Sequence, residues 1–273
     1  MFSIIIPHFN TPDLLKTCVN RIRSVYAEDG VSVPYEVIVV DDCSNTAPEL
    51  PSDAVLEIHD ANRGYAASCN TGARRAQGDI YIFLNTDIEL RSGFFKSLSG
   101  RDIDIGGLRL ETPDGTRRLS CRRFPGYMNF LFNRRSILTK LFPRNRFSSR
   151  YLMTDKFFEE TEWVSGAAMV ISRNVFRDLN GFDERFFLYF EDVDICKRAR
   201  SRGYSVVYIE DIHAVHTEGS TTSHFRRRAV QARHISMWRY YAKHIRKSVL
   251  TDIAVFPAIF LRGAVMWILG ANR

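Results

Sequence analysis

The chain has 273 residues, of which 45% are hydrophobic and 25% are charged. This composition excludes a disordered, collagen-like or low-complexity protein, and the length suits one large domain or a domain with a tail. The net charge of +7 is concentrated in two acid-free stretches, 116–154 and 226–250, which hold 18 of the 38 Lys and Arg residues. An acidic body with two basic patches favours an anionic partner, which is nucleic acid, a lipid head group or a phosphate-bearing substrate.

The N-terminal half alternates short apolar runs with helical patterns. The runs at 3–7, 35–40 and 80–84 predict buried parallel strands, and helices are expected from Pro12 to about Tyr26 and at 68–76. This order predicts an α/β fold, in which ligands bind beyond the carboxyl ends of the strands. His8, Asp41, Asp42 and Asp87 follow those strands, so we expect residues 1–90 to form a nucleotide-binding half.

The second half has a weaker pattern. A turn is expected at Asp114-Gly115, and the chain from about Phe225 is expected to be mostly helical. Between them we expect a strand at 163–171 interrupted by Ser165-Gly166, a short helix near Arg173, a helix at 191–201 and a strand at 204–209.

Carboxylates at the strand ends suit a nucleotide or a metal ion. An aspartate there can accept hydrogen bonds from a base N–H or ribose hydroxyls, and Asp87 offers a hard oxygen ligand for Mg²⁺ or Mn²⁺ beside a diphosphate. Taken alone, each of these residues also fits a cap on a turn or a helix.

Three acidic residues in four positions begin the helix expected at 191–201. The helix dipole accounts for one or two of them. Glu191 and Asp192 are adjacent and point in different directions, so only one can face a reacting atom. The positive helix end would hold that carboxylate ionised, as a general base requires. Further on, His213 and His216 could provide one metal ligand.

Several enzyme signatures are absent. The sequence has no G-x-G-x-x-G after its first strand, no G-x-x-x-x-G-K-[ST] and no G-x-S-x-G. These absences argue against dinucleotide dehydrogenases, P-loop enzymes and serine hydrolases. The five cysteines form no C-x-x-C pair and the N-terminal apolar stretch is too short for a signal peptide, so we expect a reducing compartment and no export.

A series of short motifs from Ser3 to about Ser220 resembles the family 2 inverting glycosyltransferases, and most closely their bacterial rhamnosyltransferase-like branch. The motifs occupy 3–10, 39–44, 62–70 with Gly72, 83–87, 165–169, 181–194 and 216–220. The resemblance implies a GT-A fold, with a Rossmann-like, mostly parallel sheet flanked by helices. It also implies a transferase domain at 1–224, divided into a nucleotide half at 1–90 and an acceptor and catalytic half at 91–224. A helical extension would follow at 225–273.

The resemblance also implies roles for individual residues. Asp192 matches the catalytic base, with Glu191 beside it. Asp87 matches the last position of the D-x-D metal motif, whose first position is Asn85 here, and His216 can complete a site for Mg²⁺ or Mn²⁺. Nucleotide-sugar contacts are expected from Pro7, His8, Asn10, Asp41, Asp42, Asn62, Gly64, Asn70, Asn85 and Thr86, and acceptor contacts from Trp163, Gly166 and Tyr189.

The implied reaction is transfer of a sugar, from dTDP-rhamnose or a UDP-sugar, to a hydroxyl of a bacterial surface glycan or lipid-linked acceptor. A sugar nucleotidyltransferase is an alternative, but no Gly-rich loop bearing Lys or Arg follows the first strand. An inactive membrane-bound scaffold or a nucleic-acid binder is a further alternative. The intact Asp42, Asp87 and Asp192 argue against an inactive scaffold. The acidic body and the absence of a nucleic-acid motif argue against a nucleic-acid binder.

The C-terminal stretch 249–269 is apolar but interrupted by Asp252, Pro257 and Arg262. Its longest uncharged run, 253–261, is too short to span a bilayer. Two alternatives remain, a core helix packed on the domain and a helix lying in the membrane interface behind a basic stretch that binds anionic lipid. With the second, the protein would be cytoplasmic and peripheral on the inner face of the plasma membrane.

Overall fold

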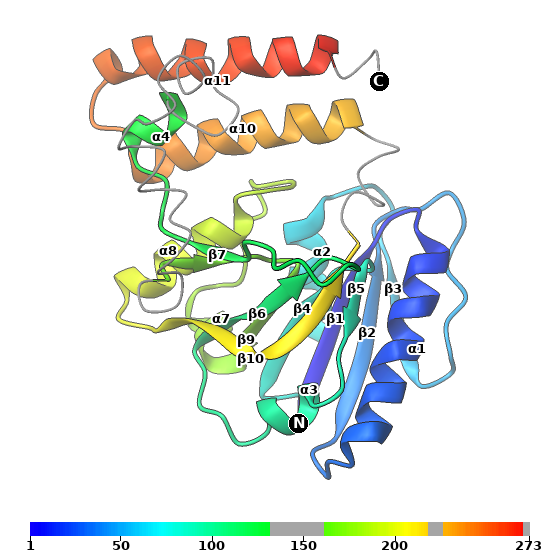
Figure 1. Ribbon diagram of the computed structural model, residues 1–273. Helices are drawn as coiled ribbons and strands as arrows, with labels where there is room; N and C mark the ends of the chain where they lie inside the picture. The colour runs from blue at the N-terminus through cyan, green and yellow to red at the C-terminus, as the bar shows by residue number, and fades with distance from the viewer. Residues whose placement is uncertain (132–160, 218–225, 270–273) are drawn as a thin grey trace.

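The computed structural model describes residues 1–131, 161–217 and 226–269, and one eight-stranded sheet forms its centre (Figure 1). The strand order is β3-β2-β1-β4-β9-β6-β10-β5. The first four of these strands are parallel, β9 is antiparallel to both of its neighbours, and β5 is antiparallel to β10 at the edge. The strands are β1 (Phe2–His8), β2 (Tyr35–Asp41), β3 (Ala54–Ile58), β4 (Ile80–Leu84), β5 (Ile88–Leu90), β6 (Ile105–Glu111), β9 (Ala168–Ser172) and β10 (Val206–His216), with a separate ribbon of β7 (Cys121–Arg122) and β8 (Trp163–Val164).

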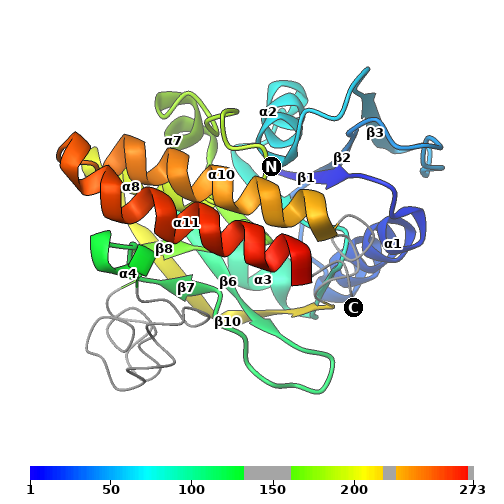
Figure 2. The ribbon, with the colours of Figure 1, turned by 90° about the horizontal axis from the view of Figure 1, so that it is seen from above.

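Helices cover both faces of the sheet (Figure 2). On one face lie α1 (Pro12–Asp29) and α3 (Phe94–Leu98), and on the other lie α2 (Tyr65–Arg75), α7 (Arg173–Asp178) and α8 (Glu191–Ser201). The two faces hold separate clusters of buried apolar side chains, as an α/β layer architecture requires. The predicted α/β fold with a mostly parallel sheet is therefore confirmed.

Several element boundaries differ from the predictions. β3, β5 and α3 were not predicted, and α2 begins at Tyr65, three residues before the expected start. The strand expected at 204–209 continues to His216 because β10 passes through an irregularity, where its register against β6 shifts between Ile209 and His213. This extension brings His216 opposite Ile88 of β5, at the end of the strand.

Two long helices form a hairpin on the side of the sheet to which the carboxyl ends of β1, β2 and β4 point (Figures 1 and 2). They are α10 (Arg226–His244) and α11 (Val249–Leu269), and they share a third buried cluster with α4 (Tyr127–Leu131) and the start of α8. α11 runs through its charged residues, and 249–268 is long and apolar enough to cross a membrane by length and composition, contrary to the estimate from its longest uncharged run. Only one face of α11, with Val255 and Ile259, is buried.

Some predictions fall on residues outside the described ranges. These are the boundary at 224–225, the end of the motif at 216–220 and the basic stretch beyond residue 131.

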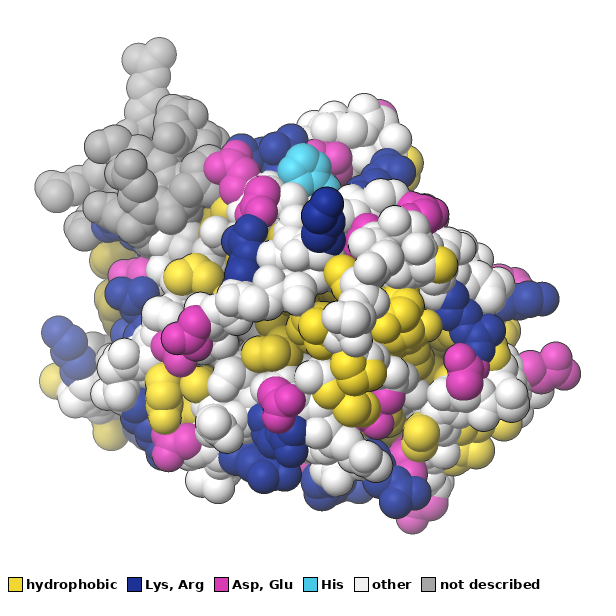
Figure 3. Space-filling model, turned by 90° about the horizontal axis from the view of Figure 1, so that it is seen from below, with side chains coloured by type: hydrophobic (Ala, Val, Ile, Leu, Met, Phe, Trp, Pro, Cys, Tyr) yellow, Lys and Arg dark blue, Asp and Glu magenta, His cyan; other side chains and the backbone are white. Residues whose placement is uncertain are grey.

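On the face opposite the hairpin, acidic and basic side chains are interspersed around a central group of hydrophobic ones (Figure 3).

Candidate active site

The carboxyl ends of β1 and β2 bring His8 and Asp41 together, as predicted. The Nδ1 atom of His8 lies 2.7 Å from Oδ1 of Asp41, and both side chains are buried. Because Nε2 of His8 accepts the backbone N–H of Thr11 at 3.1 Å, the ring proton lies on Nδ1 and is donated to Asp41. The other oxygen of Asp41 accepts the N–H of Ser44 at 3.1 Å, which fixes the chain beyond β2.

Asp42 organises a turn at the start of α2. Its two oxygens accept the backbone N–H groups of Arg63 and Gly64, at 2.8 and 2.7 Å, and Nδ1 of His59 lies 2.8 Å from Oδ1. Gly64 has a φ of +89°, and a Cβ atom there would lie 2.3 Å from the carbonyl oxygen of Phe187. The turn therefore needs glycine and touches the segment that precedes α8. His59 was not predicted, since its sequence context carries no motif.

The remaining residues predicted to contact the nucleotide lie around the same edge in different roles. Asn10 has a φ of +53°, and its backbone N–H and side-chain oxygen bond Ser44 and Asn45. Asn70 instead holds the segment before α8, because its amide donates to the carbonyl of Phe182 at 2.9 Å and accepts the Phe182 N–H at 2.9 Å. Pro7 is half-buried, Asn62 is exposed, Asn85 is half-buried and Thr86 is buried.

The two predicted metal ligands meet at the ends of β4 and β10. Nε2 of His216 lies 3.4 Å from Oδ1 of Asp87, and Asp87 is buried. The backbone N–H of Thr217 donates to the carbonyl of Asp87 at 3.0 Å, so the main chain also joins the two segments. His213 lies 3.6 Å from Glu111 instead, on the other side of the strand. Within the described residues, no group of three or more His, Cys, Asp or Glu side chains could hold a metal ion.

Asp192 lies in the first turn of α8, facing the segment between β8 and β9. Its oxygens accept two backbone N–H groups, from Gly166 at 3.0 Å and from Val193 at 2.8 Å. The carbonyl of Gly166 in turn accepts the hydroxyl of Tyr65 at 2.6 Å. Ala167, which follows Gly166, accepts the backbone N–H of Asn85 at its carbonyl. The Asp192 carboxylate therefore lies at the same edge of the sheet as Asp87.

The electrostatics of α8 differ from the sequence argument. Burial raises the pKa of Asp192, and the two backbone N–H groups only partly offset this effect. The sequence argument considered only the helix end and left out this desolvation, which opposes ionisation of the carboxylate. Burial, with the charge of Asp192, also raises the pKa of Glu191 well above its usual range. Within the described structure, Oε2 of Glu191 has no hydrogen-bond partner.

The third acid of α8, Asp194, is fully buried in an ionic cluster. Its carboxylate accepts Nε of Arg198 at 2.7 Å, and Nε2 of His244 and Nζ of Lys243 each lie 2.6 Å away. Lys243 also bonds Asp183 at 2.7 Å. This cluster fastens the C-terminal end of α10 to α8, and no motif indicated the partners on α10.

The two residues before α8 have unusual backbone conformations. Tyr189 and Phe190 have φ angles of +67° and +69°, a backbone conformation that residues other than glycine rarely adopt. α10 holds them in place, because Ser236 donates its hydroxyl to the carbonyl of Leu188 at 2.9 Å and the guanidinium of Arg233 stacks on the Tyr189 ring. Strain of this kind clusters at functional sites.

The other two predicted acceptor contacts also lie near Asp192. Gly166 is the residue that bonds Asp192, and its ideal Cβ position lies 3.3 Å from the Cβ of Asp192. Trp163 is half-buried, with its indole N–H bonded to the carbonyl of Arg123 at 2.9 Å and the guanidinium of Arg122 over its ring.

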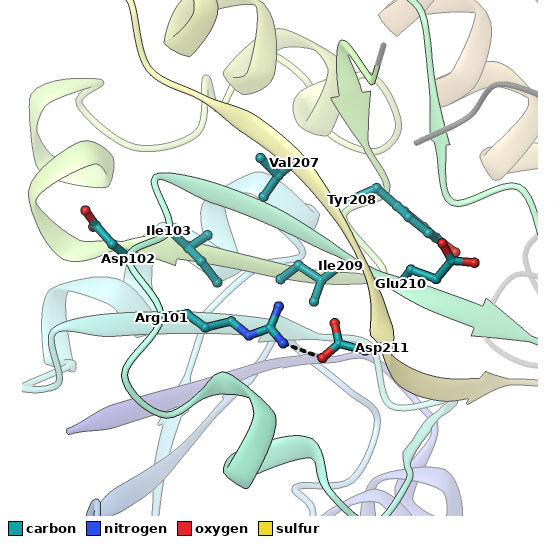
Figure 4. A pocket seen from close by; sticks show the side chains of 8 residues that line it. All are labelled: Arg101, Asp102, Ile103, Val207, Tyr208, Ile209, Glu210 and Asp211. Atoms are coloured by element: carbon teal, nitrogen blue, oxygen red, sulfur yellow. Dashed lines mark hydrogen bonds and ion pairs between the residues drawn. The ribbon is translucent and has the colours of Figure 1, made fainter. Parts of the chain in front are cut away.

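A cavity of about 390 Å³ lies away from these residues (Figure 4). It is lined by the segment that leads into β6 and by the first part of β10, and Arg101 and Asp211 pair at its edge. Arg101 precedes β6, so it lies at the amino end of this strand. Because β6 and β4 are both antiparallel to β9, that end is opposite the edge that carries Asp87. No predicted site residue lines this cavity.

The fold is shared with transferases of the GT-A type. The structure of the mannosyltransferase PcManGT from Pyrobaculum calidifontis, in complex with GDP-Man and Mn²⁺, superimposes with a TM-score of 0.54 at 17% sequence identity. The match covers 99% of this chain and 73% of that one.

Sequence comparisons give the family. Residues 3–104 match Glycosyl transferase family 2, and residues 124–269 match Glycosyl transferase family group 2. The chain therefore belongs to glycosyltransferase family 2, as its motifs predicted.

Two relatives are bacterial rhamnosyltransferases. An N-acetylglucosaminyl-diphospho-decaprenol L-rhamnosyltransferase of Mycobacterium tuberculosis is 29% identical over 173 residues, which cover 60% of this chain and 55% of the relative. Rhamnosyltransferase WbbL of Escherichia coli K12 is 26% identical over 187 residues, 66% of each chain. The chain thus matches between half and two thirds of the length of these relatives.

Proposed function

We propose that this chain is an inverting glycosyltransferase, which moves a sugar from a nucleoside-diphosphate sugar to a hydroxyl of a bacterial surface glycan or lipid-linked saccharide. The observation that carries the proposal is the meeting of two features at one edge of the sheet. One is the Asp87–His216 pair, and the other is the Asp192 carboxylate held by the Gly166 N–H. The names of the two rhamnosyltransferase relatives, one of which acts on a decaprenol-linked substrate, support the acceptor class.

Asp192 is the general base in this proposal. It takes the proton of the acceptor hydroxyl, which attacks the anomeric carbon on the face opposite the diphosphate, so that a single displacement inverts the configuration. The N–H groups of Gly166 and Val193 each donate a hydrogen bond to one oxygen of Asp192. These bonds fix the orientation of the carboxylate and of its remaining lone pairs. A raised pKa suits the role, because a more basic carboxylate removes a hydroxyl proton more readily.

Asp87 and His216 would hold a divalent cation, Mg²⁺ or Mn²⁺. A carboxylate oxygen and an imidazole nitrogen that converge at 3.4 Å are chemically suitable ligands, and phosphate oxygens of the donor commonly fill the other positions of such sites. When bound, the ion supplies stabilisation of the negative charge on the departing diphosphate. The manganese in the PcManGT complex supports this choice.

The donor in this proposal is dTDP-rhamnose or a UDP-sugar, bound along the edge that carries Asp41 and Asp42. The rhamnosyltransferase relatives support the first donor. In this proposal the chain transfers the sugar to a lipid-linked acceptor at the cytoplasmic face of the plasma membrane.

The test is nucleoside-diphosphate release from a panel of sugar nucleotides, measured with Mn²⁺ and with chelator. Slow hydrolysis of one donor is expected, with loss of turnover but retained donor binding in Asp192→Asn. Asp53→Asn, an exposed aspartate before β3, is the matched control. Full turnover in Asp192→Asn would contradict the role of the base. Diphosphate release from a nucleoside triphosphate and a sugar 1-phosphate, with no nucleoside diphosphate released from any sugar nucleotide, would indicate a nucleotidyltransferase.

A further inference from the structure

α11 presents an uncharged outward face along its whole length. Six exposed residues follow one another at intervals of three or four, which places them in one stripe: Leu250, Ile253, Pro257, Leu261, Val265 and Ile268. Five of them are large apolar side chains with most of their surface in solvent, such as Leu250 at 77% and Ile253 at 71% exposed. A helix of this length is about 30 Å long, so the stripe is a long, contiguous apolar surface of the kind that marks protein or membrane contacts.

The two charged residues of α11 do not interrupt the stripe. Asp252 is half-buried, accepts the hydroxyl of Tyr241 at 3.0 Å and pairs with Arg246 at 2.7 Å. Arg262 is half-buried as well. Asp252 thus faces α10, and the charge of Arg262 acts on His234 of α10, so the apolar face is left to solvent.

Basic side chains flank the stripe at both ends. Arg226, Arg227 and Arg228 begin α10 beside the end of α11, where the guanidinium of Arg227 lies over the Trp267 ring at 4.7 Å. Arg246 and Lys247 lie exposed in the connection before α11. The stretch 226–250 has no acidic residue. Anionic head groups complement this arrangement, whereas a second copy of the chain would bring like charges together.

We propose that the outward face of α11 docks in the interface of an anionic membrane, with the helix parallel to the bilayer. Val255 and Ile259 stay packed on the domain in this arrangement, so α11 lies on the membrane and does not cross it. Trp267, 43% exposed at the end of the stripe, sits at head-group level. The inference deepens the proposed function, because a lipid-linked acceptor would then reach the side of α10 that contacts the segment before Asp192.

Flotation of the full chain with vesicles tests the docking. We expect binding to phosphatidylcholine vesicles that contain phosphatidylglycerol, little binding to phosphatidylcholine alone, and quenching of Trp267 fluorescence by brominated lipid that is absent in Trp267→Phe. The double variant Ile253→Glu, Val265→Glu should bind about tenfold more weakly or less. Val55→Glu, an exposed apolar residue on the edge strand β3, should bind as the unmodified chain does.

Three outcomes would overturn the docking. The first is equal flotation of the double variant and the unmodified chain. The second is resistance of bound protein to alkaline carbonate, which indicates a spanning helix. The third is a dimer in solution that the double variant abolishes, which assigns the face to a second copy. Donor binding, measured by calorimetry without vesicles, separates this inference from the proposed function: intact donor binding without flotation refutes only the docking.

Discussion

The ionic cluster of Asp194 gives a prediction that can be worked out from the structure. Asp194→Asn keeps the size of the side chain but removes the charge that Arg198, Lys243 and His244 share. Removing one partner of a buried ion pair costs about 3–5 kcal/mol. The lower end applies here, because Lys243 keeps its bond to Asp183 and Arg198 keeps its bonds to two carbonyl oxygens.

We therefore expect Asp194→Asn to lose about 3 kcal/mol of unfolding free energy, which corresponds to a fall in Tm of roughly 6–12 °C for a domain of this size. Urea denaturation and calorimetry at neutral pH measure both quantities. Asp211→Asn is the matched control, since its partner Arg101 is exposed and such surface pairs contribute about 0–1 kcal/mol. Equal unfolding midpoints for the two variants would refute the structural role of the cluster.

The pH dependence provides a second check on the same variant. Burial acts to raise the pKa of Asp194, but the bond from His244 and the charges of Arg198 and Lys243 outweigh it, so the pKa is lowered overall. A carboxyl whose pKa is lowered by folding stabilises the protein above its unfolded pKa of about 3.9. The difference in unfolding free energy between the unmodified chain and Asp194→Asn should then be steady near neutral pH. It should shrink as the pH falls through the pKa of Asp194 in the folded protein.

Three further predictions concern the edge of the sheet. Asp87→Ala should abolish any increase of donor affinity caused by Mn²⁺ in calorimetry, and a retained increase would rule out Asp87 as a ligand. Gly64→Ala should lose about 1–3 kcal/mol in urea denaturation, because the new Cβ meets Phe187 at a positive φ, and an unchanged midpoint would contradict this contact. Glu191→Gln should be the more stable form at about pH 8 but not at about pH 4, because a carboxyl whose pKa is raised by folding loses stability as the pH rises. A difference in unfolding free energy between Glu191→Gln and the unmodified chain that is the same at both pH values would contradict the burial of an ionisable group at position 191.

The sequence predicted the parts of the fold that carry a strong local signal. Ile4, Ile5 and Ile6 are fully buried in β1, as their apolar run indicated, and α8 has the predicted bounds, 191–201. β3 escaped prediction because an edge strand is half exposed and its apolar run, Ala54 to Leu56, is only three residues long before Glu57. The three residues of β5 are too few for any periodicity.

For the site, the sequence predicted which residues gather but not what holds them. His8, Asp41 and Asp87 could be placed because strand ends meet at one edge, and His216 was assigned from the resemblance of its motif. The partners of Asp194 could not, because His244 is 50 residues away and only the packing of α10 brings it close. Such contacts depend on tertiary structure and leave no pattern in the local sequence.

The segment 181–190 links these observations. At one end Asn70 of α2 bonds Phe182, and at the other Ser236 of α10 bonds Leu188. Two residues in the left-handed region then lead directly into Glu191 and Asp192. Such a conformation costs about 1–3 kcal/mol for each residue and persists only where surrounding contacts fix it. The direction of the Asp192 carboxylate thus depends on the predicted nucleotide-binding half through α2 and on the helical hairpin through α10. A hairpin docked on a membrane would therefore fix the proposed base relative to the membrane that carries the proposed acceptor.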